Sequence, residues 1–208
     1  MSERRHHQPE YSHPGGIILL AGLSGVGKST LIHDALAEYP EQLRYLKDFT
    51  TRPRRTTDTD TEYLFVNDAE FDRQRSLAED WQEGSIYNNR YGHDVAVYKK
   101  ILQIGNFLVG CCYPSLEDVQ SLEAHYDPST ITVLHIELPY NIRAERLISQ
   151  RGAEGHARLE KDATWSMSKD YRTRIDFLFN SNRTKDENGF AFNALLGQVF
   201  RNSRNKPF

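Results

Sequence analysis

The sequence predicts an α/β fold in which helices cover both faces of an open parallel sheet. Near the start of the chain, a branched apolar run at 16–21 leads into a glycine-rich loop. A segment with helical spacing of apolar residues follows at 29–39. Further along, short apolar runs alternate with amphipathic segments, which is the pattern of successive strand–helix units. At 208 residues the chain suits one such domain.

The elements expected in the first half surround a polar segment. The helix at 29–39 ends before Pro40, and residues 48–62 are then rich in arginine and threonine. We expect this segment to be too polar for a core element. The elements that follow are a strand at 63–66, a helix from Asn67 or Asp68 to about Ser76, and a strand-like stretch at 85–87.

The second half predicts buried strands that alternate with helices. Gly105 would end one helix, and Pro114 stands at the start of the next. The helices are expected at 95–104, 115–125, 140–150, 157–171 and 190–200. The strands are expected at 106–112, 131–138 and 175–179. Together with the first strand they form an open parallel sheet.

The loop between the first strand and helix carries a complete G-x-x-x-x-G-K-[ST] motif. A glycine loop between a strand and a helix directs backbone N–H groups and the helix N-terminus at a polyphosphate. Lys28 is expected to reach the β- and γ-phosphates, and the Ser29 hydroxyl to bind Mg²⁺. The residues predicted to bind the triphosphate are Gly22, Ser24, Gly25, Val26, Gly27, Lys28, Ser29 and Thr30.

Composition excludes several classes of protein. The 29 acidic and 26 basic residues nearly balance, which argues against nucleic-acid binding. No apolar run approaches the ~20 residues that span a bilayer. Residues 1–14 lack the apolar core of a signal peptide, and we expect a disordered polar tail followed by one domain at 15–208. The adjacent Cys111 and Cys112 are expected to be reduced thiols, as in a cytoplasmic protein.

A second anion site is predicted in the polar segment. Arg52 and Arg54 follow two threonines, and guanidinium groups with hydroxyl neighbours suit a phosphate dianion. Tyr63 and Tyr91 can donate to the same phosphate. A solvated basic loop is the alternative, but a phosphate-transferring enzyme needs a second anion site for its acceptor.

These motifs resemble those of the guanylate kinases, members of the nucleoside monophosphate kinase family, over about residues 16–182. The resemblance implies a P-loop kinase fold with ATP and Mg²⁺, an acceptor-binding insert at about 46–94 and a short lid at about 146–160. It also implies the roles of individual residues. The phosphate of the acceptor would be held by Arg52, Arg54, Tyr63 and Tyr91. The transferring phosphoryl group would be held by Lys28, Arg146, Arg151 and Arg158. Adenine would lie near Asn180, and the base of the acceptor near Asp48 and near Glu83 or Gln82.

The chain departs from the family pattern where the base is recognised. Thr56-Thr57 replace a Gly-Glu pair, and His93 replaces a hydroxyl residue after Tyr-Gly. A D-x-D sequence at the end of the second central strand becomes Gly110-Cys111-Cys112. The resemblance therefore covers the phosphate-binding groups better than the base-reading groups. Glu137 or Asp48 could instead support the magnesium ion, although pairing of Glu137 with Arg143 is the simpler interpretation.

Three functions remain open from the sequence. The first is an ATP-dependent phosphotransferase that converts GMP to GDP. The second is a kinase of the same fold with another phosphorylated acceptor, such as ribose 1,5-bisphosphate. The third is a non-catalytic guanylate-kinase-like binding module, but such modules typically lose the ATP loop, which is intact here. The sequence does not indicate an oligomeric state.

Overall fold

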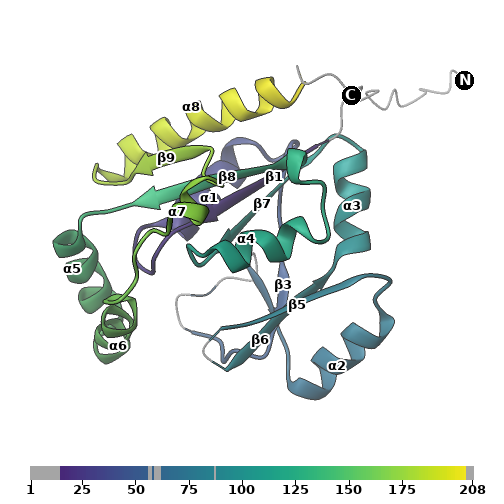
Figure 1. Ribbon diagram of the computed structural model, residues 1–208, viewed down its shortest axis with the longest axis horizontal. Coiled ribbons are helices and arrows are strands. Elements are labelled where there is room, and N and C mark those ends of the chain that lie inside the picture. The colour runs from purple at the N-terminus through teal and green to yellow at the C-terminus, as the bar shows by residue number, and fades with distance from the viewer. Residues whose placement is uncertain (1–14, 56–57, 59–61, 87, 205–208) are drawn as a thin grey trace, which may run out of the picture.

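The computed structural model describes residues 15–55, 58, 62–86 and 88–204 (Figure 1). The predicted tail at 1–14 and the Thr56-Thr57 pair lie outside the described residues. Five parallel strands form the central sheet in the order β2-β7-β1-β8-β9. Their bounds are β1 Ile17–Ala21, β2 Leu43–Tyr45, β7 Phe107–Cys112, β8 Ile131–Glu137 and β9 Phe177–Asn180.

Strand β1 lies at the centre of this sheet and is buried along its whole length. Its side chains alternate between the two faces, as a strand requires. Ile18 and Leu20 belong to one core cluster, with residues of the helices α1 (Lys28–Glu38) and α8 (Lys185–Arg204). Ile17 and Leu19 belong to a second cluster, with residues of α3 (Val95–Gln103) and α4 (Leu116–Glu123). The predicted arrangement, a parallel sheet with helices on both faces, is therefore confirmed.

Helices cover both faces of the sheet (Figure 1). Helix α1 begins at Lys28, directly after the glycine loop, so the sheet places the start of α1 at the carboxyl edge of its strands. The helices that pack on the sheet are α1 Lys28–Glu38, α3 Val95–Gln103, α4 Leu116–Glu123, α7 Lys169–Arg172 and α8 Lys185–Arg204, and the 3₁₀ turn η1 spans Pro128–Thr130. None of the described helices is long and apolar enough to cross a membrane.

A second sheet, below the central one in Figure 1, forms the insert. Its four strands run in the order β4-β3-β6-β5, with β3 and β4 parallel and the other pairs antiparallel. The insert comprises β3 Asp48–Thr50, β4 Tyr63–Phe65, α2 Asp68–Leu77, β5 Trp81–Ile86 and β6 Asn89–Asp94. Asn67 caps α2 by accepting from the Glu70 amide at 2.8 Å, as its position in the sequence predicts.

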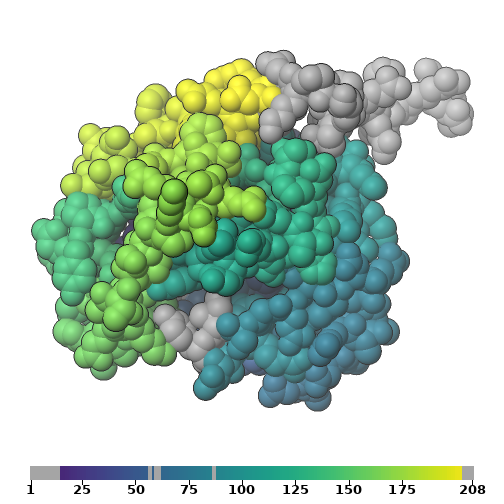
Figure 2. Space-filling view, in the orientation of Figure 1, coloured from purple at the N-terminus to yellow at the C-terminus, as the bar shows by residue number. Residues whose placement is uncertain are grey.

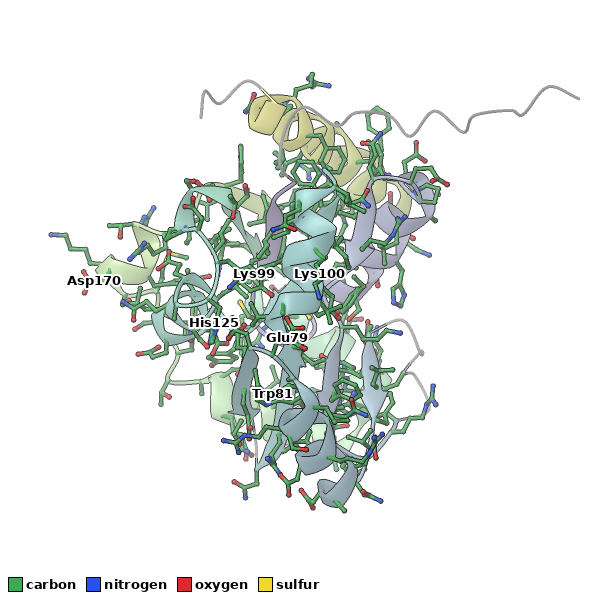
Figure 3. The ribbon with its side chains drawn as sticks, turned by 90° about the vertical axis from the view of Figure 1, so that its right-hand side faces the viewer. Glu79, Trp81, Lys99, Lys100, His125 and Asp170 are labelled. Carbon is green, nitrogen blue, oxygen red and sulfur yellow. The ribbon has the colours of Figure 1, made fainter. Side chains whose placement is uncertain are left out.

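Ion pairs join the insert to the main domain on the side seen in Figure 3. Asp80, just before β5, lies 3.1 Å from Lys99 Nζ on α3 and 3.2 Å from His125 Nδ1 after α4. Next to it, Lys100 and Glu79 are 3.9 Å apart. These contacts hold one end of the insert against α3 and α4.

Two closely packed helices, α5 Tyr140–Arg151 and α6 Ala153–Asp162, contain the segment expected to act as a lid and are called the lid helices, or the lid for short. Gly152 separates them with a φ of 52°, a value that favours glycine. Gly155 lets α6 approach α5, because a Cβ atom there would lie 2.3 Å from the Leu147 carbonyl oxygen. The helix expected at 157–171 is wrong: α6 ends at Asp162, and α7 begins separately at Lys169 after a Ser168 cap.

Other differences from the predicted elements also have local causes. The Asp48–Thr50 stretch forms strand β3 although it is polar, because it pairs on both sides within the insert. Strand β2, at Leu43–Tyr45, was not expected and lies at the edge of the central sheet. Helix α8 begins at Lys185 rather than near residue 190, because the side chain of Thr184 accepts from the Glu187 amide and forms an N-cap.

Candidate active site

A cleft of about 1260 Å³ lies between the phosphate loop, the insert and the lid. In Figure 2 the green lid helices lie at the lower left and the blue insert at the lower right. All of the residues predicted for the triphosphate line this cleft, from Gly22 to Thr30, as do the predicted lid arginines. The carboxyl edge of the central sheet thus meets the insert at one binding region.

The phosphate loop has the conformation that its glycines predict. Gly25 and Gly27 have φ values of 86° and 99°, and Gly27 is the N-cap of α1. Leu147 of α5 packs against Gly25 so closely that an added Cβ would meet its Cγ at 2.6 Å. The Lys28 ammonium donates to the carbonyl oxygens of Gly22 and Leu23, the latter at 3.1 Å. Burial lowers the pKa of Lys28, and negative groups nearby partly offset this effect.

Arg52 is held in place by a carboxylate that sequence analysis did not identify. Asp58 accepts from both terminal nitrogens of Arg52, at 2.9 and 3.0 Å, and from the Arg55 amide at 2.6 Å. Both side chains of the pair are 7% exposed. The rings of Tyr63 and Phe65 lie under the guanidinium, each 5.2 Å from its carbon. Asp58 therefore fixes the fork-shaped guanidinium beside the cleft. The one sign of this pairing in the sequence is that a carboxylate follows Arg52 by six residues within the same polar segment.

The two predicted tyrosines lie beside Arg52. Tyr63 lies on β4 and Tyr91 on β6, on either side of β3. Their ring centroids are 5.8 Å apart, and both residues line the cleft. The neighbouring Cys111 and burial raise the pKa of Tyr63 well above its usual value, so its hydroxyl stays protonated and able to donate. Arg54 also lines the cleft and lies over Phe65, with its guanidinium carbon 5.1 Å from the ring centroid.

A cluster of arginines crosses the cleft from the insert to the lid. Arg55 Nη2 lies 2.8 Å from Glu154 Oε1, and the same oxygen accepts from Arg158 at 3.1 Å. Arg151 Nη1 is 3.9 Å from that oxygen and is buried with no hydrogen-bond partner among the described residues. Burial and neighbouring arginines lower the pKa values of Arg55 and Arg151. Positive charge therefore exceeds negative charge here, which suits a polyanion. Sequence analysis did not single out Arg55 or Glu154.

Arg158 also contacts the phosphate loop directly, because its Nη1 donates to Ser24 Oγ at 2.9 Å. Arg146 lines the cleft as well. The three predicted lid arginines therefore all line the cleft, although Arg146 and Arg151 are five residues apart on α5, a spacing that turns their side chains by roughly 140° from each other.

The far end of the cleft carries a polar network in place of the family's base-reading groups. His93 is 5% exposed, and its two ring nitrogens lie 2.7 Å from Asp48 Oδ1 and 3.3 Å from the Tyr126 hydroxyl. Gln82 donates to Ser121 Oγ at 3.0 Å, and its buried Oε1 has no partner within the part of the chain that the structure describes. This end therefore presents carboxylate and amide oxygens that can accept hydrogen bonds.

Three residues considered from the sequence do not line this cleft. Glu83 alternates with Gln82 on β5, so its side chain lies on the opposite face, where it accepts from Arg90 Nε at 3.0 Å. Gln82 lines the cleft instead. Asn180 and Glu137 line a separate, smaller cavity behind the phosphate loop. The expected pairing of Glu137 with Arg143 is wrong, because Arg143 pairs with Asp162 at 2.7 Å.

The donor set fits a magnesium ion held largely by its nucleotide. Ser29 lines the cleft at the start of α1 and offers one hydroxyl ligand. Among the described residues, no cluster of three or more His, Cys, Asp or Glu could hold a metal ion by itself. Mg²⁺ commonly keeps several waters and binds substrate phosphates with few protein ligands, so Ser29 suffices as the direct contact. Cys111 and Cys112 are free thiols whose pKa values are raised by burial, so they remain protonated.

Comparisons with known proteins agree with this geometry. The family model for guanylate kinase matches residues 15–187. The chain is 42% identical over 80 residues to guanylate kinase of Thermobifida fusca, which covers 38% of this chain and 40% of the relative. It is 38% identical over 79 residues to guanylate kinase of Symbiobacterium thermophilum, which covers 38% and 37%. The matched segment thus spans about two-fifths of each of these relatives.

A solved structure shows the same fold over most of the chain. The crystal structure of guanylate kinase from Anaplasma phagocytophilum superposes with a TM-score of 0.62 at 17% identity, covering 93% of this chain and 88% of that one. The predicted P-loop kinase fold is confirmed by this likeness. The family model spans most of the domain, including the phosphate loop, the insert and the lid. The chain therefore belongs to the guanylate kinase family.

Proposed function

We propose that this protein is an ATP-dependent phosphotransferase that transfers the γ-phosphoryl group of ATP to GMP and forms GDP. One observation carries the proposal: the phosphate loop and the Arg52–Tyr63–Tyr91 group line the same cleft, with lid arginines between them. A site that joins two phosphorylated substrates needs an anion-binding group for each. The intact phosphate loop argues against a non-catalytic binding module.

Phosphoryl transfer depends mainly on positioning and on neutralising negative charge. Lys28 would leave the loop carbonyls and bind the β- and γ-phosphates, while Arg158 and Arg151 would contact the transferring group. Mg²⁺ bound with ATP would neutralise charge on the same phosphates and contact Ser29. The 5′-phosphate of the acceptor is already ionised near neutral pH, so no general base is required. Arg52, fixed by Asp58, would orient that phosphate together with Tyr63.

The far end of the cleft supports a guanine base. Guanine presents N1–H and N2–H₂ as neighbouring donors, and Asp48 and Gln82 Oε1 are acceptors. Adenine offers an acceptor at N1, which would face these oxygens without a hydrogen bond. We therefore propose GMP over AMP. Because Gly110, Cys111 and Cys112 replace the family's carboxylates, another phosphorylated acceptor such as ribose 1,5-bisphosphate is the second candidate.

The proposal is tested by measuring ADP release from Mg-ATP with GMP, dGMP, AMP, UMP and ribose 1,5-bisphosphate offered one at a time. We expect the highest kcat/KM with GMP. Release with ribose 1,5-bisphosphate but not with GMP would favour the second candidate, and no release with any acceptor would contradict both. Lys28→Ala must abolish turnover, whereas Lys100→Ala, an exposed lysine on α3, must leave it unchanged (Figure 3).

A further inference from the structure

The most deeply buried ion pair among the described residues joins α5 to the end of α6, and its carboxylate lines the cleft. Arg143 of α5 and Asp162, the last residue of α6, are 2.7 Å apart with side chains 4% and 1% exposed. Removing two charges from water costs several kcal/mol per ion unless the geometry repays it, and apolar replacements of such pairs are often neutral or stabilising. A contribution to stability is therefore a weak explanation for the presence of this buried pair.

The pair connects four separate segments. Arg143 Nη1 also donates to the carbonyl oxygen of Ser24 in the phosphate loop at 3.3 Å. The hydroxyl of Tyr113, which follows β7, donates to Asp162 Oδ1 at 3.3 Å. The phosphate loop, α5, the end of α6 and the segment after β7 thus meet at one buried ion pair.

The same arrangement determines where Arg158 lies. Arg158 and Asp162 are one turn apart on α6 and so share a face. Arg158 contacts Ser24 Oγ, while Arg143 contacts the carbonyl oxygen of the same Ser24. Arg143 and Leu147 are likewise one turn apart on α5, and Leu147 packs on Gly25. Both lid helices therefore contact the phosphate loop close to the buried pair. Helix α5 does so through Arg143 and Leu147, and α6 does so through Arg158.

We propose that Arg143 and Asp162 are positioning residues that fix the lid helix α6 on the phosphate loop, so that Arg158 is placed over the bound phosphates. This inference rests on the proposed phosphotransfer only for its activity readout. The pair anchors the C-terminal end of α6, while Glu154 contacts the arginine cluster at the other end. Burial lowers the pKa of the Lys28 ammonium, and the negative charge of Asp162 partly offsets this effect.

The test replaces the pair by apolar side chains, Arg143→Met with Asp162→Leu. This double variant removes the contacts to Ser24 and Tyr113 without leaving a buried unpaired charge, so we expect it to fold with an unfolding midpoint close to that of the wild type. The matched control is Arg174→Met with Glu123→Leu, a pair outside the cleft with the same 2.7 Å separation. Asp162→Asn serves as a third variant that keeps the shape of the side chain.

Three quantities are measured on each variant: the Kd of Mg-ATP by calorimetry, amide hydrogen exchange of residues 153–162, and kcat with GMP. For the apolar double variant we expect kcat to fall at least tenfold, Mg-ATP binding to weaken, and exchange in α6 to accelerate, with no such change in the control. A folded double variant with wild-type affinity, exchange and turnover would overturn the proposal. If the wild type shows no turnover, the proposed function fails, and affinity and exchange still decide this inference.

Discussion

Replacing Glu154 by Gln removes a carboxylate that three arginines of the cleft share. Its Oε1 lies 2.8 Å from Arg55, 3.1 Å from Arg158 and 3.9 Å from Arg151. This carboxylate accepts from arginines that we propose bind phosphate. A bound polyphosphate must therefore compete with Glu154 for the same donors.

The magnitude follows from distance and exposure. Unit charges about 4 Å apart interact by about 1 kcal/mol in water and about 4 kcal/mol at an effective dielectric of about 20. The Glu154 side chain is 45% exposed, so solvent screening keeps the net contribution of the three contacts together near the lower value. Removing the competing charge should strengthen Mg-ATP binding by about 1 kcal/mol, which is about fivefold in Kd.

Calorimetric titration with Mg-ATP and with inorganic tripolyphosphate measures this effect, and Glu160→Gln, an exposed residue of α6 outside the cleft, is the control. The gain should shrink as salt is added, because exposed charges are screened. Unchanged or weaker binding by Glu154→Gln would refute the competition and show that the carboxylate instead holds the arginines in place for the ligand.

The same variant has a defined pH dependence. Burial alone would raise the pKa of Glu154, but Arg55 and Arg158 outweigh it and hold the pKa below the ordinary value of 4.5. A depressed carboxyl pKa contributes stability above the unfolded-state value, and this contribution is lost as pH falls through the folded-state value. The wild type should therefore be more stable than Glu154→Gln near neutral pH, and thermal unfolding should show this difference shrinking as the pH falls below 4.5.

Three further changes test other parts of the site. Asp58→Asn leaves Arg52 buried beside a neutral amide, so urea denaturation should show a loss of about 2–3 kcal/mol in the free energy of unfolding. Initial rates should show a raised KM for GMP, and an unchanged KM would argue against binding of phosphate by Arg52. Gly155→Ala brings a Cβ within 2.3 Å of the Leu147 carbonyl oxygen, so it should cost about 1–3 kcal/mol of stability in the same denaturation assay. Asp48→Asn exchanges an acceptor oxygen for a donor, so the ratio of kcat/KM for GMP to kcat/KM for AMP should fall at least tenfold. An unchanged ratio would show that Asp48 does not contact the base.

The strand, loop and helix that carry the phosphate-binding motif are predictable from the sequence because the signal is local. Strand β1, the glycine loop and the start of α1 are contiguous, and a single short motif specifies their conformation. The placement of Lys28 and Ser29 in the cleft follows directly from that continuity. Most strands and helices of the central sheet were also predictable, because their apolar residues recur with the period of a strand or a helix.

The rest of the site depends on contacts between distant segments. The partner of Arg143 could not be read from its neighbours, because Asp162 reaches it only once α5 and α6 fold against each other. Glu83 was placed in the cleft from its approximate position, but strand alternation gives that face to Gln82. A shift of one residue reverses the face of a strand, and no local signal fixed the register of β5.

The most direct test of the central claim is the identity of the products formed from Mg-ATP and GMP. Chromatography of the nucleotides at timed intervals should show ADP and GDP appearing in equal amounts, with no ADP formed when GMP is omitted and neither formed by Lys28→Ala. Formation of ADP without GDP, or failure to form either from any phosphorylated acceptor, would contradict the account of this cleft as a two-substrate phosphoryl-transfer site.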